Sequence, residues 1–114
     1  METPVLWHNP KCSKSRQAVA LLKNKGIQFH EVRYMDVAPS IAELEAYLAI
    51  VGQPAVEIMR KKEPLFRELS LDLSDEKALI QAMHQFPRLI ERPVLFANGK
   101  AVIGRPTEAL LEIL

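Results

Sequence analysis

The sequence contains a single cysteine, so it cannot form an internal disulfide bond. A chain without disulfides suits a reducing compartment. It also lacks any apolar stretch approaching the roughly 20 residues needed to cross a bilayer, and it begins without the basic and apolar regions of a secretory signal. We therefore expect a cytoplasmic protein that is neither secreted nor membrane-spanning.

An excess of charge of either sign is also missing. Fifteen basic side chains nearly balance fourteen acidic ones, which gives a formal net charge of +1. Without a large positive field, binding to nucleic acid or to an anionic membrane is not expected. The three histidines are scattered and form no metal-ligand spacing with the one cysteine. The sequence therefore predicts no metal site and no bound cofactor.

What the chain does have is the composition of a folded globular domain, with 48% hydrophobic and 25% charged residues. Its 114 residues predict one domain over residues 1–114. Near the start, a short apolar strand over residues 5–8 precedes a helix over residues 13–25, which Gly26 ends. A second strand over residues 27–34 would complete a βαβ unit.

The middle of the chain is predicted to be helical. Ser40 and Glu43 have the spacing of a capping box, and an apolar stripe follows them as far as Gly52. A short helix is expected over residues 54–60, and another begins at residues 74–76 and ends before a proline. These elements predict a helical insertion at about residues 40–90.

The last part of the chain predicts a β-hairpin and a final helix. Asn98-Gly99 is a strong signal for a two-residue turn, and apolar runs flank it on both sides, so both faces of this part of the sheet should be covered. Pro106 suits the first turn of a helix ending at Leu114. Together these elements predict an α/β fold with a mixed sheet, in the order βαβ, helical insertion, ββα.

The cysteine, Cys12, falls in the turn between the first strand and the first helix. Free backbone amides and the helix dipole stabilise an anion at such a position, and a thiolate is an anion. Ser15 can direct its hydroxyl at the sulfur, and His8 is close enough to lend charge or a hydrogen bond. The basic residues of this loop are Lys11, Lys14 and Arg16, which no acid interrupts. The setting indicates a lowered thiol pKa.

Two familiar cysteine motifs are absent from this loop. A Cys-x-x-Cys redox pair would need a cysteine where Ser15 stands. A Cys-x5-Arg phosphatase loop would need an arginine where Ala18 stands. A nucleophilic cysteine without a resolving partner must be regenerated by an external thiol, such as glutathione or a thiol protein.

Two arginines stand at the open end of the predicted hairpin. In the register of a two-residue turn, Arg92 faces Arg105. Directly opposed like charges are unfavourable, so either an anion lies between the guanidiniums or the side chains diverge. Each arginine also precedes a proline, which makes both bonds candidates for cis peptides. A third arginine, Arg60, is predicted to end the short helix of the insertion.

The ordered motifs His8-Asn9-Pro10-x-Cys12-x-x-Ser15-Arg16, Met59-Arg60-Lys61, Glu91-Arg92-Pro93 and Gly104-Arg105-Pro106 resemble the glutaredoxin-dependent arsenate reductases of the ArsC family over nearly the whole chain. The resemblance is strongest to a short bacterial subgroup, and it implies a thioredoxin-like fold with an α-helical insertion.

The resemblance also implies a role for each residue. Cys12 would be the nucleophile that attacks arsenate, and His8 and Ser15 would help to activate it. Arg60, Arg92 and Arg105 would hold the oxyanion. Glutathione would serve as co-substrate and glutaredoxin as the partner that regenerates the thiol.

Two other functions stay open at this stage. One is a thiol oxidoreductase that acts on another oxyanion or on mixed disulfides. The other is a Spx-like regulator that binds RNA polymerase, because the same fold serves such proteins. Ser15 removes the Cys-x-x-Cys switch that these regulators typically carry.

Overall fold

The computed structural model describes residues 3–114. Contacts within the chain divide it into two compact units. The first combines residues up to Tyr34 with Arg92–Leu114, and the second is Met35–Glu91. The first unit therefore joins the two ends of the sequence and contains the sheet, whereas the second is built from helices.

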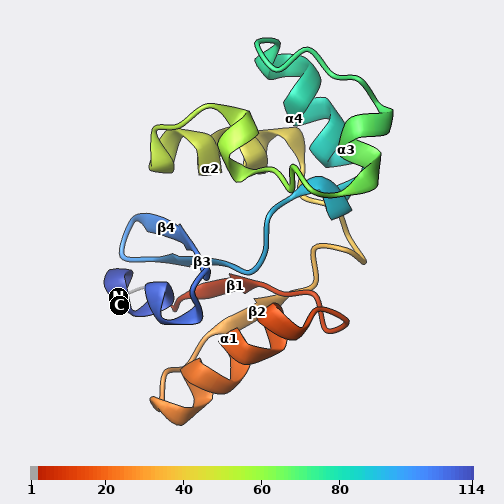
Figure 1. The fold of residues 1–114 in the computed structure, drawn as a ribbon. Coiled ribbons are helices and arrows are strands. Elements are labelled where there is room, and N and C mark those ends of the chain that lie inside the picture. The colour runs from red at the N-terminus through yellow and green to blue at the C-terminus, as the bar shows by residue number, and fades with distance from the viewer. Residues whose placement is uncertain (1–2) are drawn as a thin grey trace. The chain divides into compact units, whose positions relative to one another are not determined.

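A four-stranded mixed sheet forms the centre of the first unit, and its strand order is β2-β1-β3-β4 (Figure 1). The first two strands are parallel, while β3 runs antiparallel to both β1 and β4. The predicted α/β class and mixed sheet are confirmed. The strands are β1 (Val5–Trp7), β2 (His30–Val32), β3 (Val94–Ala97) and β4 (Lys100–Ile103).

One face of this sheet packs against helix α1 (Ser13–Asn24) and the 3-10 helix η3 (Thr107–Ile113). The buried positions of α1 lie three or four residues apart, so they form one stripe along the helix. Burying a leucine side chain fully is worth about 1.5–3 kcal/mol, so this cluster anchors the helix on the sheet. Its fully buried members are Leu6, Ala18, Leu22, Leu95 and Leu110.

Aromatic side chains gather on the opposite face of the same sheet. The ring centroid of Trp7 lies 6.4 Å from that of Tyr34 and 4.8 Å from that of Phe96. Side chains alternate along a strand, so Trp7 faces away from Leu6 and away from α1. The alternation also places the next residue, His8, on the side that α1 covers.

The hairpin of β3 and β4 has the predicted turn. Asn98 and Gly99 both have positive φ angles, of 54° and 71°, as a type I′ turn requires. The register pairs Val94 with Ile103 and Ala97 with Lys100, as predicted. The prediction that both strands are covered is confirmed only for β3, because β4 is an edge strand whose residues are exposed or half-buried.

The second unit contains three α-helices: α2 (Ile41–Val51), α3 (Pro64–Glu68) and α4 (Glu76–Gln85). Helix α2 begins with the predicted capping box and ends at Gly52, which adopts the left-handed conformation. Asp75 caps α4 by accepting a hydrogen bond from the amide of Ala78. Two 3-10 helices, η1 (Ala55–Ile58) and η2 (Pro87–Leu89), complete the unit.

Several predicted boundaries were wrong. The short helix expected over residues 54–60 is the 3-10 turn η1, and it ends at Ile58. The final helix is also a 3-10 helix, with Pro106 at its N-cap rather than in its first turn. Strand β2 is shorter than predicted, because β1 has only three residues with which it can pair. Helix α3 was not predicted, since five residues are too few for an apolar period.

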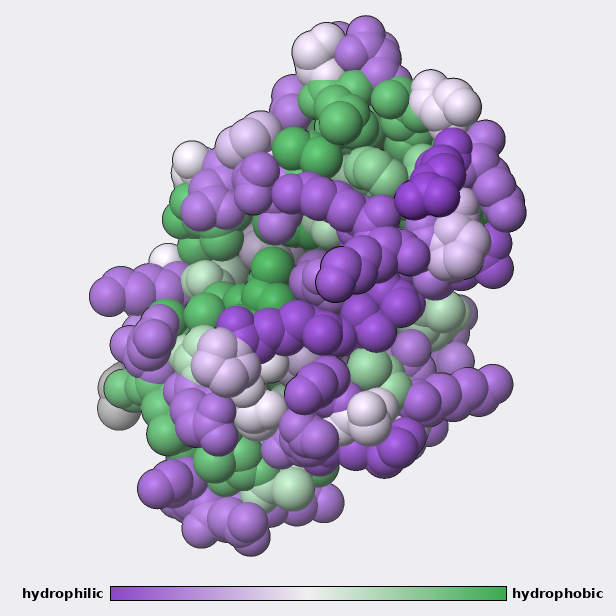
Figure 2. Space-filling view, in the orientation of Figure 1, coloured by the Kyte–Doolittle hydropathy of each residue, from purple (hydrophilic) through white to green (hydrophobic). Residues whose placement is uncertain are grey.

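The surface is mixed in character. Figure 2 shows hydrophilic side chains over much of the visible face, with smaller apolar areas between them. None of the helices described over residues 3–114 is long and apolar enough to cross a membrane.

The capping box of α2 should make a measurable contribution to stability. The hydroxyl of Ser40 accepts a hydrogen bond from the amide of Glu43, and the carboxylate of Glu43 accepts one from the amide of Ser40. We expect Ser40→Ala to lower the free energy of unfolding by about 1 kcal/mol, because the amide of Glu43 loses its partner. Urea denaturation checks this value. Ser40→Asn retains a cap and should remain near wild type, and equal losses in both variants would contradict the assignment.

Candidate active site

Cys12 occupies the N-cap position of α1, at the end of a turn that follows β1. Its amide donates a hydrogen bond to the carbonyl of Asn9 at 3.0 Å, and its carbonyl accepts one from the amide of Arg16 at 3.0 Å. The side chain is only partly buried. The sulfur therefore stands at the positive end of the helix dipole and remains within reach of solvent.

Arg92 brings a guanidinium to the same sulfur. Its Nε donates a hydrogen bond to the Sγ of Cys12 at 3.2 Å. The sheet explains this approach, because Val94 in β3 pairs with Trp7 in β1. The residues just before β3 therefore lie beside the end of β1, from which the chain leads to Cys12. The peptide bond between Arg92 and Pro93, which the sequence marked only as a candidate, is cis.

The balance of these surroundings favours the thiolate. Burial raises the pKa of the Cys12 thiol, but the backbone N–H of Ser15, the guanidinium of Arg92 and the backbone N–H of Lys14 lower it. The net result is a pKa below the ordinary cysteine value. Because the thiolate is the nucleophilic form, a lowered pKa enlarges the fraction of Cys12 in that form at neutral pH.

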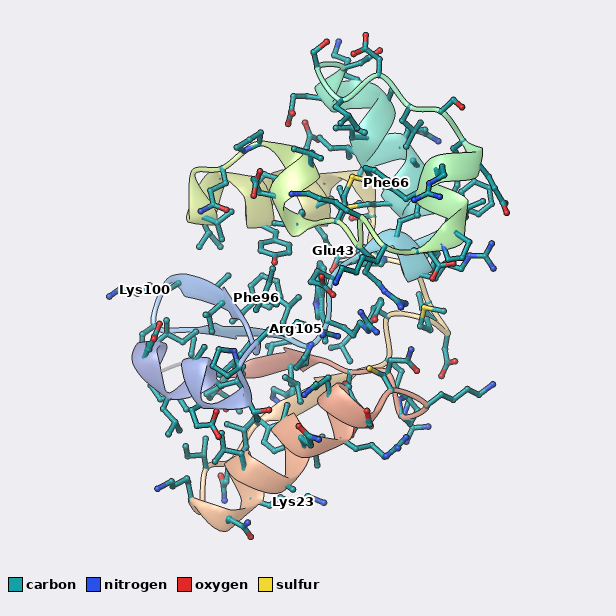
Figure 3. The ribbon with its side chains drawn as sticks, in the orientation of Figure 1. Lys23, Glu43, Phe66, Phe96, Lys100 and Arg105 are labelled. Carbon is teal, nitrogen blue, oxygen red and sulfur yellow. The ribbon has the colours of Figure 1, made fainter. Side chains whose placement is uncertain are left out.

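Arg105, labelled in Figure 3, lies at the open end of the hairpin. Its Nε donates a hydrogen bond to the backbone carbonyl of Arg92 at 2.8 Å. The two arginines are thus neighbours, as their register predicted, and one guanidinium approaches the sulfur while the other holds the backbone of its neighbour. The bond between Arg105 and Pro106, the other candidate, is also cis. Arg105 itself is exposed.

Ser15 and His8 meet beneath the loop. The Nδ1 of His8 lies 2.6 Å from the Oγ of Ser15, and that same Oγ accepts a hydrogen bond from the amide of Asn9 at 2.9 Å. Both side chains are buried, and Ser15 belongs to the buried stripe of α1. The hydroxyl is therefore directed at His8. The prediction that it points at the sulfur is wrong. The contribution of Ser15 to the thiolate comes from its backbone N–H.

His8 does not lend a charge to the site. Burial lowers the pKa of His8, the carboxylate of Glu31 raises it, and Arg33 and Arg16 lower it, which leaves the pKa below its ordinary value. The imidazole is therefore largely neutral at pH 7. Its Nε2 lies 3.9 Å from a carboxylate oxygen of Glu31. Glu31 carried no sequence signal, because only the register of β2 against β1 brings it to this place.

The three other basic residues near Cys12 are exposed: Lys11, Lys14 and Arg16. The guanidinium of Arg16 donates a hydrogen bond to the carbonyl of Pro10 at 2.9 Å, so it helps to fix the loop. The amide of Lys11 bonds to the side chain of Asn9. These contacts hold the turn around Cys12 in shape.

Arg60 belongs to the second unit. It follows the 3-10 helix η1 instead of ending a helix, and its amide donates a hydrogen bond to the carbonyl of Leu89 at 2.7 Å. Its guanidinium lies 3.6 Å from the carboxylate of Glu63 and bonds weakly to the carbonyl of Arg88 at 3.4 Å. The predicted role of Arg60 in anion binding stays a prediction.

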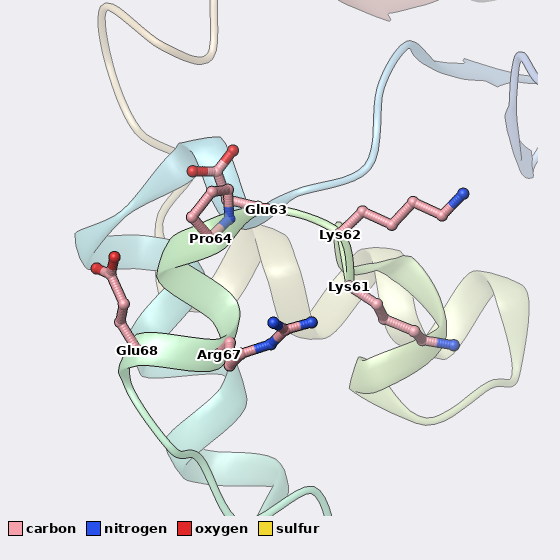
Figure 4. Close-up of a pocket in the computed structure, with 6 residues that line it drawn as sticks. All are labelled: Lys61, Lys62, Glu63, Pro64, Arg67 and Glu68. Carbon is pink, nitrogen blue, oxygen red and sulfur yellow. The ribbon is translucent and has the colours of Figure 1, made fainter.

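A pocket of about 350 Å³ lies beside α3 in the second unit. Figure 4 shows the basic side chains of Lys61, Lys62 and Arg67 extending away from the carboxylate of Glu68. The lining contains neither cysteine nor histidine, so this pocket holds no thiol and no imidazole. Over residues 3–114, no group of three histidine, cysteine or acidic side chains could hold a metal ion. Cys12 therefore stays the candidate nucleophile that the sequence predicts.

The fold and the site define a class of protein. The first unit is a mixed sheet with α1 packed on one face, and it presents a single thiol with a lowered pKa at the start of that helix. These features define a protein of thioredoxin-like fold that carries one partly exposed thiol at the start of its first helix.

The sequence pattern that describes the ArsC family matches residues 7–113, and the chain belongs to this family. It is 49% identical over 112 residues to a protein of Escherichia coli K12 named uncharacterized protein YfgD, covering 96% of this chain and 94% of that one. It is 42% identical over 112 residues to a protein of Neisseria meningitidis serogroup A named arsenate reductase, covering 96% of each.

A solved structure described as arsenate reductase from Vibrio cholerae superposes with a TM-score of 0.92 and 44% identity, covering 98% of both chains. This likeness extends over nearly the full length, so it includes the sheet, the Cys12 loop and the helical unit. The thioredoxin-like fold implied by the sequence motifs is confirmed.

Removing the guanidinium at position 92 should make the thiol less acidic. We expect Arg92→Gln to raise the pKa of Cys12, because the thiolate loses a hydrogen bond and a positive charge. The pH dependence of alkylation by iodoacetamide measures this, and its midpoint should move to higher pH. Arg67→Gln removes an exposed arginine that does not contribute to the Cys12 pKa, so it serves as a control. An unchanged midpoint in Arg92→Gln would contradict the assignment.

Proposed function

We propose that this protein reduces arsenate to arsenite, with Cys12 as the nucleophile. The observation that carries the proposal is the hydrogen bond from Arg92 to the Cys12 sulfur, together with the lowered pKa of that thiol. A guanidinium at this distance can hold an oxyanion beside the atom that attacks it. Relatives at 42% identity that are named arsenate reductase support arsenate as the substrate.

In the first step, the Cys12 thiolate attacks arsenic in arsenate. A sulfur–arsenic bond forms, and one arsenate oxygen leaves as water after protonation. Arsenic remains in its pentavalent state, so no electrons have yet been transferred. Arg92 and Arg105 carry the positive charge that offsets the anionic adduct, because Arg92 contacts the sulfur and Arg105 contacts the backbone of Arg92.

In the second step, the thiol of glutathione attacks the adduct. The glutathione sulfur bonds to the Cys12 sulfur, the sulfur–arsenic bond breaks, and its electron pair stays on arsenic. Arsenic is thereby reduced by two electrons and leaves as arsenite, while Cys12 is left in a mixed disulfide with glutathione. A thiol of glutaredoxin then reduces this disulfide and restores Cys12. The need for external thiols follows from the sequence, which holds no second cysteine that could resolve the intermediate.

The other predicted residues support this sequence of steps. His8 and Ser15 fix the base of the Cys12 loop through their mutual hydrogen bond and through the hydrogen bond that the amide of Asn9 donates to Ser15. Their contribution is to activate the nucleophile indirectly, since His8 is largely neutral at pH 7. Arg60 is proposed as a third cation for the oxyanion, on the strength of the family motif around it.

The direct test is arsenite formation by purified protein supplied with glutathione and glutaredoxin. We expect wild-type protein to form arsenite and Cys12→Ser to form none, because serine is far less acidic than a thiol and cannot form the mixed disulfide. Ser13→Ala is a matched control that changes an exposed hydroxyl beside the nucleophile. Equal rates for wild type and Cys12→Ser would exclude the proposal.

The same assay distinguishes the competing thiol chemistry. Mass spectrometry of Cys12 after exposure to glutathione disulfide, with and without arsenate, reports which partner the sulfur takes. If glutathionylation is efficient while arsenite never forms, the protein acts on mixed disulfides or another oxyanion. Omitting glutaredoxin should leave Cys12 trapped as its glutathione disulfide after one turnover.

The arginines can be tested separately from the nucleophile. We expect Arg105→Gln to lower kcat/KM for arsenate by about 10- to 100-fold, which is the effect of losing one charge-assisted hydrogen bond. Arg60→Gln should act in the same direction if it binds the oxyanion. Steady-state kinetics with arsenate as the varied substrate checks both variants, with Arg67→Gln as the control. A wild-type kcat/KM in Arg60→Gln would remove that residue from the site.

A further inference from the structure

The pairing of β2 with β1 places Glu31 on the side of the sheet that α1 covers, where its side chain stays partly exposed. In that parallel pair, Glu31 stands opposite Leu6, and the amide of His8 donates a hydrogen bond to the carbonyl of Val32. His8 directly follows β1, and the alternation of side chains puts it on the same side as Leu6, the side covered by α1. Glu31 is therefore held beside His8 by the backbone of the sheet and not by a flexible loop.

A row of polar groups runs from Glu31 to the Cys12 loop. One carboxylate oxygen of Glu31 lies 3.9 Å from the Nε2 of His8. The Nδ1 of His8 lies 2.6 Å from the Oγ of Ser15, which accepts a hydrogen bond from the amide of Asn9. The carbonyl of Asn9 in turn accepts a hydrogen bond from the amide of Cys12. Glu31, with 34% of its side chain exposed, is the member of this row that faces solvent.

The proton positions along this row follow from what each group can do. A neutral imidazole carries one proton, on either Nδ1 or Nε2. A carboxylate can only accept, so the charge of Glu31 favours the proton on Nε2. The Nδ1 of His8 is then an acceptor, and the donor in the 2.6 Å contact is the hydroxyl of Ser15.

We propose that Glu31 is a positioning residue, whose carboxylate selects the Nε2–H tautomer of His8 and thereby commits the hydroxyl proton of Ser15 to His8. In the opposite tautomer, Nδ1–H would donate to Ser15, and the hydroxyl proton would be released to seek another acceptor. The carboxylate of Glu31 thus decides whether Ser15 or His8 donates the hydrogen bond between them. Its catalytic meaning rests on the proposed function, whereas the proton positions do not.

Arg33 completes the arrangement by orienting the carboxylate. Its Nε donates a hydrogen bond to one oxygen of Glu31 at 3.0 Å, while the other oxygen is the one nearest His8. More than half of the Arg33 side chain is exposed, so this ion pair adds little stability by itself. Its effect is to leave a single carboxylate oxygen directed at the imidazole.

The first experiment observes the tautomer directly in the resting protein. Long-range proton–nitrogen NMR correlation at neutral pH distinguishes the two nitrogens of each of the three histidines, and His8→Gln identifies the signals of His8. We expect the proton on Nε2 in wild type and a substantial population of the Nδ1–H form in Glu31→Gln. Glu112→Gln, which neutralises an exposed carboxylate near the C-terminus, should leave the His8 signals unchanged.

The pKa of His8 provides a second test, because removing Glu31 and removing Arg33 should shift it in opposite directions. Glu31 raises this pKa and Arg33 lowers it. We therefore expect Glu31→Gln to move the titration of His8 to lower pH and Arg33→Gln to move it to higher pH. A purely structural role for the ion pair would move both variants in the same direction.

A double-mutant cycle then tests whether Glu31 acts through the hydroxyl. Glu31→Gln should change the rate of Cys12 alkylation by about two-fold or more when Ser15 is present, and by much less in a Ser15→Ala background. Equal effects in both backgrounds would show that Glu31 does not act through Ser15. Thermal unfolding of each variant identifies any that fail to fold, and the NMR measurement on wild type alone still decides the tautomer.

Two results would overturn the proposal: a proton on Nδ1 of His8 in wild type, or an unchanged tautomer in Glu31→Gln. Neither measurement needs arsenate or glutathione. If the protein formed no arsenite while His8 carried its proton on Nε2 and lost this preference in Glu31→Gln, the proposed function would fail and the inference about Glu31 would stand.

Discussion

The contact between the Arg92 guanidinium and the Cys12 sulfur is the interaction on which the site depends. Partial burial on its own would raise the pKa of the thiol and leave it unreactive. The guanidinium and two backbone amides reverse that effect. The remaining features of the first unit serve to bring these groups together: β1 leads into the loop, α1 supplies the amides, and the start of β3 delivers the arginine beside the end of β1. A strand slip of one residue would turn these side chains to the other face.

The same arrangement explains why the nucleophile and its supports come from distant parts of the sequence. Eighty positions separate Arg92 from Cys12, and the helical unit of Met35–Glu91 accounts for most of that interval. Because the two ends of the chain share one sheet, the insertion can be long without changing the register of β1 with β3. The hairpin then places Arg105 against the backbone of Arg92. The chemistry of the loop is therefore assembled by strand pairing, with each strand fixing one component.

Local signals in the sequence predicted much of this structure. The capping box at Ser40, the Asn98-Gly99 turn and the position of Cys12 before a helix were each confirmed, because each depends on residues close in the chain. The predictions that were wrong or missing had no such local signal in the sequence. The hydroxyl of Ser15 turned to His8, since the helix buries that position against the sheet. Glu31 could not be found at all, because its neighbour in space is set by the pairing of two strands 25 residues apart.

The groups that act on Cys12 are of two kinds: backbone amides within its own turn, and side chains that strand pairing brings from elsewhere in the chain. The backbone amides of Lys14 and Ser15 stabilise the thiolate whatever their side chains are, so position in the turn is sufficient. The side chains of Arg92, His8 and Glu31 act only if the sheet forms in the observed register. An anion-stabilising turn alone would make a reactive thiol without substrate preference. Long-range pairing adds the cation that suits an oxyanion, and it adds a carboxylate that sets the direction of a buried hydrogen bond.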